Sequence, residues 1–209
     1  MRSERRRMLM TYHGLEYIEN TSNAYIDTGI IPNADTEIEC KILYNNSGFF
    51  FGCRYGFNNK EYSIIKETGD YVRFSFGGKQ QIYKIIPTNT RLSIIINTKQ
   101  CIIQDEIFNF NSVLTSTDLP LYLFCCNQTG EAIQPSAYLK IYDFIVKEKG
   151  ILVRNFVPAK RDDGVIGMYD LVGRKFYTSP NGVAFTGGVK FKIFMASLFK
   201  SAMAERRAA

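Results

Sequence analysis

The chain has 209 residues, of which 45% are hydrophobic and 14% aromatic, enough for the core of a single β-sandwich domain. No apolar run is long enough to span a bilayer, and the basic N-terminal stretch lacks the apolar region of a secretory signal, so we expect neither membrane insertion nor a signal peptide. The formal charge of +6 belongs to the ends, because residues 1–8 carry a net +3 and residues 190–209 a net +4, which leaves −1 between them.

Short basic ends of this kind are typical of solubilising or partner-docking arms, and the sequence contains no recognisable nucleic-acid-binding module. We therefore expect no specific nucleic-acid recognition. The five cysteines form no CxxC pair, and His13, the only histidine, lies in what we expect to be a flexible flank. A zinc site needs clustered thiolate and imidazole ligands, so we predict no metal, no cofactor, and free cysteines in a reducing compartment.

The first part of the chain reads as a series of short strands. Residues 15–33 are predicted to hold one or two opening strands around the polar turn NTSN. Residues 36–44 alternate strictly between apolar and polar side chains, which predicts a half-buried strand. Further strands separated by polar turns are predicted at 49–54, 61–66, 71–76, 81–86, 91–97 and 101–108.

The second part continues the pattern. Residues 121–127, LYLFCCN, are apolar on both faces and are predicted to form one central strand, with a loop over 127–136. The block from Lys140 to Gly188 combines alternating strands with three turns and reads as closing strands. Many short strands about ten residues apart indicate an all-β fold, an antiparallel sandwich or a barrel, and we favour the two-sheet sandwich.

The C-terminal segment differs, since its apolar residues repeat at helical spacing. We predict a short amphipathic helix that docks on the sandwich or on a partner through one face. That partner-docking face contains Met195, Leu198, Phe199, Ala202 and Met203. The predicted organisation is therefore a basic arm at 1–13, a β-sandwich at 14–188 and a basic helical tail at 189–209.

Catalytic motifs are weak. With one histidine, a Ser–His or Cys–His arrangement is not expected, and no phosphate- or dinucleotide-binding glycine motif is present. A glycoside hydrolase needs two carboxyls across a sugar groove, and Glu37 with Glu39 forms a candidate pair. Their position opposite Ile38 and Cys40 favours a solvated outer face instead, so we predict that the protein is not an enzyme.

Three aspartates, Asp162, Asp163 and Asp170, suggest calcium as one alternative. The Asp-Asp-Gly sequence is more typical of a tight turn, and a strand-end aspartate usually binds nearby backbone N–H groups. Arg154 and Arg161 supply the cations for ion pairs. We favour this structural interpretation over a metal site.

Carbohydrate binding without hydrolysis needs aromatic faces and planar polar groups. The loop after FFFGCR and the strands near it supply both types of side chain. The candidate glycan-groove residues are Arg54, Tyr55, Phe57 and Asn58 in and beside this loop, Arg73 with Tyr71 on a neighbouring strand, and Asn127 with Gln128 at a strand end. The alternative is that these are ordinary loop and sheet-face residues.

Several motifs carry a family resemblance: LEYIENTSNAYIDTGI, FFFGCR, LYLFCCN, LKIYDFIV, GILVRNFVPAKR, DDGVIGMYDLVGRKFYTS and NGVAFTGG. In this order they resemble a module common in phage and prophage structural proteins of gut bacteria, which is similar to the concanavalin A-like (laminin G-like) jelly-roll superfamily. The resemblance spans residues 14–188. It implies a two-sheet jelly roll attached to tail, fibre or surface proteins, which binds glycans or neighbouring virion subunits. It brings no defined ligand motif, so no binding residue is carried over from it.

We therefore expect a non-enzymatic phage virion protein, a decoration, fibre or tail component, attached through its terminal arms. Its expected place is the virion, after synthesis in the cytoplasm of the bacterial host. Expected partners are other virion proteins and a host surface glycan, with the chain as a homo-oligomer or a subunit of a larger assembly. The alternatives are a host-glycan-binding module for adhesion and, more weakly, a glycoside hydrolase.

Overall fold

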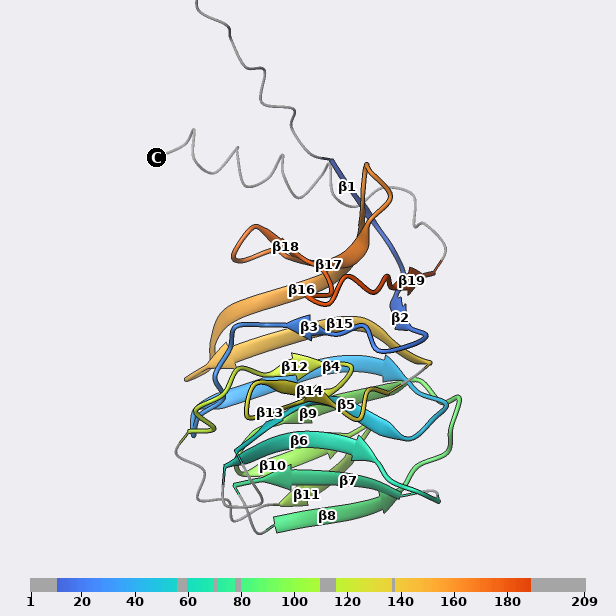
Figure 1. Ribbon diagram of the computed structural model, residues 1–209. Coiled ribbons are helices and arrows are strands. Elements are labelled where there is room, and N and C mark those ends of the chain that lie inside the picture. The colour runs from blue at the N-terminus through green and yellow to red at the C-terminus, as the bar shows by residue number, and fades with distance from the viewer. Residues whose placement is uncertain are drawn as a thin grey trace, which may run out of the picture.

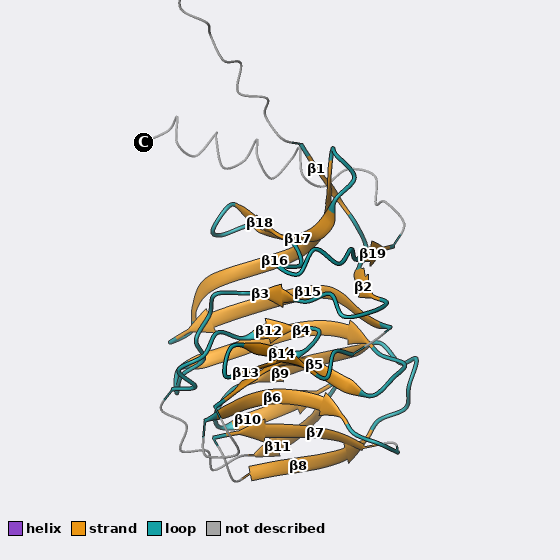
Figure 2. Cartoon of the chain, viewed as in Figure 1, coloured by secondary structure: helices purple, strands orange, loops and turns teal. Residues whose placement is uncertain are grey.

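The computed structural model describes residues 11–55, 60–69, 71–77, 80–109, 116–136 and 138–188. These residues form nineteen strands and no helix (Figures 1 and 2). None of the described segments is a helix long and apolar enough to cross a membrane. The predicted C-terminal helix and its five docking residues lie outside the described residues.

The strands form two sheets. The first sheet has eleven strands: β1 (Tyr12–Gly14), β2 (Ile18–Asn20), β4 (Thr36–Leu43), β9 (Leu92–Ile96), β10 (Gln100–Ile103), β11 (Glu106–Asn109), β15 (Leu139–Glu148), β16 (Ile151–Arg161), β17 (Ile166–Asp170), β18 (Lys175–Tyr177) and β19 (Thr186–Gly187). The second sheet has eight: β3 (Ile26–Asp27), β5 (Gly48–Arg54), β6 (Glu61–Lys66), β7 (Tyr71–Phe76), β8 (Gln80–Ile85), β12 (Tyr122–Leu123), β13 (Cys126–Gln128) and β14 (Glu131–Ile133).

The main path of the first sheet runs β11-β10-β9-β4-β15-β16-β17-β18, and that of the second runs β14-β13-β5-β6-β7-β8. In the view of Figure 1, β6 and β7 of the second sheet lie in front of β10 and β11 of the first. Almost every pairing is antiparallel, and β13 with β5 is parallel. The predicted all-β, two-sheet sandwich is confirmed.

One apolar core joins the two sheets. The ring of Phe51 on β5 lies 5.2 Å from that of Phe144 on β15, edge to face. Tyr62 on β6 reaches across the interface and donates its hydroxyl hydrogen to the carbonyl of Ile96 on β9, at 3.0 Å. Burying each such side chain contributes about 1.5–3 kcal/mol, so these contacts hold the sheets together as one body.

The alternation of residues 36–44 acts as predicted. Ile38, Cys40 and Ile42 on β4 are buried in the core, whereas Glu39 and Lys41 lie on the outer face of the sheet. A strand with one buried face shows this period of two because successive side chains point to opposite sides.

The prediction of one strand over residues 121–127 is wrong. All seven side chains are buried, but Phe124 has a φ of 71° and bends the chain between β12 and β13. β12 pairs antiparallel with β5, and β13 then pairs parallel with the same strand. The predicted loop at 127–136 also contains a strand, β14, which forms a hairpin with β13. The continuous run of apolar residues therefore predicted correctly that the segment is buried. It did not predict that the segment is divided into two strands.

The expectation of a flexible flank at His13 is also wrong. His13 lies in β1, which pairs with β16, so the sheet includes two residues of the arm predicted for 1–13. The Tyr12 ring lies 4.8 Å from that of Tyr169 and 5.1 Å from that of Phe176. This aromatic packing fixes β1 to the edge of the sandwich.

Candidate binding groove

The outer face of the second sheet carries a row of polar side chains on β5, β6 and β7. Their strand neighbours point inward to the core, so the period of two turns these polar residues outward. The strand register places three pairs opposite each other: Arg54 and Glu61, Ser63 and Ser75, and Ile65 and Arg73. Two guanidinium groups therefore come to one face from strands that flank β6.

Arg73 is held in place on three sides. Its Nε donates to Glu67 Oε1 at 2.7 Å, and its Nη1 donates to Ser75 Oγ at 2.6 Å. A third contact joins Nη1 to Glu61 Oε1 at 3.6 Å, as an ion pair. Arg73 is only 8% exposed, so these charge-assisted contacts stabilise one orientation of its planar group.

Arg54 is held by a neighbour on the next strand. Its Nε donates to Gln128 Oε1 on β13 at 2.7 Å, and its guanidinium carbon lies 5.5 Å from the centre of the Phe49 ring. Phe49 belongs to a second, small apolar cluster with Ile65 and Cys126. Phe49 and Cys126 are fully buried, so this cluster supports Arg54 by packing and offers no exposed ring to a ligand.

Arg54, Ile65 and Arg73 line an open groove of about 560 Å³, a volume typical of small-molecule sites. Glu67 and Thr68 form one wall at the β6–β7 turn. Gln134 and Pro135 form the other, because the Phe49 N–H donates to the Gln134 carbonyl at 3.1 Å and ties that segment to β5.

The structure brings two of the predicted glycan residues together, since Arg54 and Arg73 line the same groove. Tyr55 follows Arg54 directly and is 56% exposed, although it does not line the groove. Phe57 and Asn58 lie outside the described residues.

Asn127 is placed elsewhere. It is 1% exposed, its Nδ2 donates to the Pro120 carbonyl at 2.9 Å, and its Oδ1 accepts from the Gly130 N–H at 2.9 Å. Both ends of the amide serve the backbone, so Asn127 shapes the β13–β14 turn and is not available to a ligand.

Sequence patterns did not identify Glu67, Gln134 or Pro135 as groove residues. Glu67 follows β6 and could have been found from its spacing to Arg73 across the β6–β7 hairpin. The segment around Gln134 reaches β5 through a contact more than eighty positions away along the chain, between Gln134 and Phe49. No local pattern signals such a contact.

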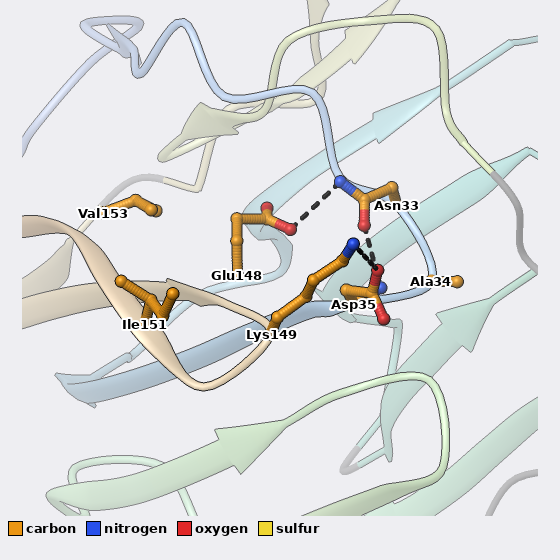
Figure 3. A pocket seen from close by; sticks show the side chains of 7 residues that line it. All are labelled: Asn33, Ala34, Asp35, Glu148, Lys149, Ile151 and Val153. Atoms are coloured by element: carbon orange, nitrogen blue, oxygen red, sulfur yellow. Dashed lines mark hydrogen bonds and ion pairs between the residues drawn. The ribbon is translucent and has the colours of Figure 1, made fainter.

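A second hollow, of about 550 Å³, lies beside the β15–β16 hairpin (Figure 3). Its polar groups bind one another: Glu148 accepts from Asn33 Nδ2 at 3.0 Å and from Thr36 Oγ1 at 2.7 Å. Lys149 Nζ lies 3.8 Å from Asp35 Oδ2. With its carboxylates engaged in this way, the hollow stabilises the hairpin and presents few groups to a ligand.

The carboxyl pair considered for hydrolysis lies on the outer face of the first sheet. Lys147 on β15 contacts both carboxylates, with its Nζ 3.5 Å from Glu37 Oε1 and in direct contact with Glu39. Asn97 Nδ2 also donates to Glu37 Oε2 at 3.1 Å. These are cross-strand ion pairs of a solvated sheet face.

The three aspartates considered for calcium have separate partners. Asp163 pairs with Arg161 at 2.6 Å, Asp162 with His13 at 2.7 Å, and Asp170 with Arg154 at 3.4 Å. No group of three or more metal-binding side chains occurs within the described ranges. The three therefore act as the predicted turn and ion-pair residues.

No family model matches the chain, and no curated protein matches its sequence. Among solved structures, the fold is similar to that of a protein from Bacteroides ovatus ATCC 8483 to which carbohydrate binding is attributed, with a TM-score of 0.55 and 14% sequence identity. The match covers 87% of this chain and 62% of that one, so the chain spans less than two thirds of that neighbour. The likeness supports the two-sheet sandwich as the fold of this chain.

Proposed function

We propose that the protein binds carbohydrate in the groove on the outer face of β5, β6 and β7. The observation that carries this proposal is the pair of guanidinium groups, Arg54 and Arg73, which neighbouring side chains hold over one open groove. Fixed planar donors suit the hydroxyl and ring oxygens of a sugar, and a hydrogen bond to a charged donor contributes about 1.5–3 kcal/mol. The likeness in fold to the Bacteroides ovatus protein supports the same function.

The groove also offers acceptors and nearby rings. Glu67 and Gln134 line it and supply oxygens for sugar hydroxyl hydrogens. Tyr71 begins β7, close to the turn that carries Glu67, and is 47% exposed. Tyr71 does not line the groove, but its exposed ring beside this turn offers a face on which a sugar ring can stack.

We propose binding without hydrolysis. Glu67, which lines the groove, and Glu61 on β6 both contact Arg73. Hydrolysis requires one carboxyl that gives a proton and a second that attacks or activates water. Because both carboxylates contact Arg73, their arrangement serves to orient Arg73 and not to supply the two separate carboxyl roles that hydrolysis needs.

A glycan array followed by calorimetry tests this function. We expect saturable binding of at least one glycan, and we expect Arg54→Ala to weaken it about tenfold, which corresponds to one lost charged hydrogen bond. Arg73→Lys keeps the charge, loses the planar fork, and should also weaken binding. The control is Lys99→Ala, at the exposed β9–β10 turn of the other sheet. A blank array, or Arg54→Ala that binds like the unmodified protein, would refute the proposal.

We also propose that the chain is a subunit of a larger assembly. The resemblance of its motifs to phage structural proteins favours a phage virion as that assembly. One structural observation supports attachment through both ends: β1 and β19, the first and last described strands, lie in the same upper part of the sandwich in Figure 1. The Gly188 N–H donates to the Tyr17 carbonyl at 3.0 Å, and a Cβ on Gly187 would lie 2.6 Å from Leu15 Cδ1. Two arms from one end can hold one attachment point.

Deletion of residues 190–209 tests the attachment. We expect the truncated protein to fold and to bind glycan as before, while it no longer enters particles or oligomers measured by sedimentation. Unchanged incorporation would contradict attachment through this arm and would leave the carbohydrate proposal untouched.

A further inference from the structure

A further pocket, of about 420 Å³, lies where the edge of the first sheet meets the β3 segment of the second. Arg154 on β16 and the β18 residues Lys175 to Tyr177 form one side, and Asp27, Thr28 and Gly29 form the other. It is separate from the groove on β5–β7, with which it shares no lining residue.

A buried carboxylate orients the arginine of this pocket. Asp170 is fully buried, and its oxygens accept from the N–H groups of Asn155, Val172 and Gly173 at 3.0–3.1 Å. A Cβ on Gly173 would lie 2.5 Å from Asp170 Oδ2, so glycine is required for this close approach. Asp170 Oδ2 then lies 3.4 Å from Arg154 Nε and fixes the direction of the guanidinium group.

Arg154 and Lys175 keep hydrogen-bond donors that these contacts do not use. Arg154 Nη1 donates to the Val153 carbonyl at 2.8 Å, but buried Nε lacks a hydrogen bond, and Nη2 makes none with any described residue. Lys175 Nζ lies 4.7 Å from the centre of the Tyr177 ring and forms no ion pair within the described chain. Arg154 Nε faces the Asp170 carboxylate and is inaccessible, so the groups that an anionic ligand can reach are Arg154 Nη2 and the Lys175 ammonium.

Tyr177 and Asp27, which also line the pocket, indicate which class of ligand it suits. The Tyr177 ring packs edge to face on the core residue Phe156 at 5.2 Å and is fixed as a wall. Asp27 accepts the Gly29 N–H through Oδ1 at 2.9 Å, and its second oxygen is an acceptor for a ligand hydroxyl. The pocket thus combines cationic donors, an aromatic wall and a hydroxyl acceptor.

We propose that this pocket binds a carboxylate-bearing sugar residue, such as a uronic acid, with its carboxylate on Arg154 and Lys175. A neutral sugar would leave the cationic donors unsatisfied, and a simple carboxylate would leave Asp27 and the Tyr177 wall without contacts. The site is independent of the groove on β5–β7.

Titration of the full chain by NMR with glucuronate, glucose and acetate, at equal ionic strength, tests the site. We expect glucuronate to shift resonances of Lys175 and Tyr177, with binding at least tenfold tighter than that of glucose or acetate, and weaker at high salt because the contacts are ionic. Lys175→Ala, an exposed position, should weaken glucuronate binding about tenfold and still fold. Arg154→Lys keeps a cation beside buried Asp170 and should also weaken it.

Arg54→Ala, in the groove, is the matched control and should leave these shifts unchanged, which separates this site from the proposed function. Equal binding of glucose and glucuronate would overturn the proposal, as would full affinity in Lys175→Ala. Equal binding of acetate would reduce the pocket to a simple anion site and overturn the sugar class. The absence of shifts at Lys175 and Tyr177 would also overturn it.

Discussion

Gly48 is the residue on which the wall of the β5–β7 groove depends. Its φ is 129°, a conformation that L side chains rarely adopt, and a Cβ there would lie 2.7 Å from the Ser136 Cα and 2.8 Å from the Pro135 carbonyl oxygen. Both neighbours are backbone atoms, so no side-chain rotation relieves the contact. The glycine lets the 134–136 segment cross β5 closely enough to form the groove.

Gly48→Ala is therefore expected to destabilise the protein, with about 1–3 kcal/mol from backbone strain alone and more from the clash. Urea denaturation measures the change in the free energy of unfolding. Gly130→Ala separates the two causes, because Gly130 has a φ of 97° but open space around its Cβ position. Gly14→Ala, with neither feature, should be nearly neutral. Equal stability of Gly48→Ala and Gly14→Ala would contradict this account of the groove wall.

Arg54 and Arg73 show what a sequence reveals about single residues. Both were identified as candidates, because cationic residues on alternating strands next to an aromatic loop are a local pattern. Asn127 was a candidate as a polar residue at a strand end, yet its amide binds the backbone at Pro120 and Gly130. The pattern cannot distinguish a polar residue that faces a groove from one that holds a turn.

At the scale of strands, the regular alternation of apolar and polar residues predicted most of the strand positions. β6 and β7 have the predicted bounds, 61–66 and 71–76, because polar turns punctuate an apolar pattern on both sides. β12 and β13 were not predicted as separate strands, because the residues from 121 to 126 are apolar throughout. Only the positive φ of Phe124 divides them, and the sequence pattern does not show it. The parallel pairing of β13 with β5 depends on that break and on residues far apart in the chain.

The attachment of β1 depends in part on hydrogen bonds to Asp162. His13 Nε2 lies 2.7 Å from Asp162 Oδ1, and the Thr11 N–H donates to Asp162 Oδ2 at 3.2 Å. These hydrogen bonds, the one to His13 first, lower the pKa of Asp162 below its ordinary value of 3.8. A carboxyl with a lowered pKa stabilises the folded strand above that range, and the stabilisation is lost as the pH falls through the lowered value.

Protection of β1 amides against hydrogen exchange should therefore fall several-fold when the pH drops below 3.8. Asp162→Asn should show the weaker protection already at neutral pH. Asp163→Asn is the matched control, because Asp163 has a pKa lowered by Arg161 and no hydrogen bond to β1. Equal β1 protection in both variants at neutral pH would show that the Asp162 contact does not hold the strand.

At the scale of the whole molecule, the two sheets share one core, and the five cysteines of the chain lie on both sheets. Cys40 and Cys101 lie on the first sheet, Cys53 and Cys126 on the second, and Cys125 between β12 and β13. All five are free and buried. Burial raises the pKa of Cys53 to about 12 and raises that of each of the others. The reactive thiolate is therefore scarce in the folded state.

We expect the folded protein to resist alkylation by iodoacetamide at pH 8, and all five thiols to react once urea unfolds it. Because the core is continuous between the sheets, the cysteines of both should become reactive at the same urea concentration. Pulse alkylation with mass spectrometry identifies each modified residue, and circular dichroism gives the global midpoint. Release of Cys53 and Cys126 at a lower concentration than Cys40 and Cys101 would show that the second sheet unfolds first. The groove on β5–β7 would then rest on a sheet with its own, lower stability.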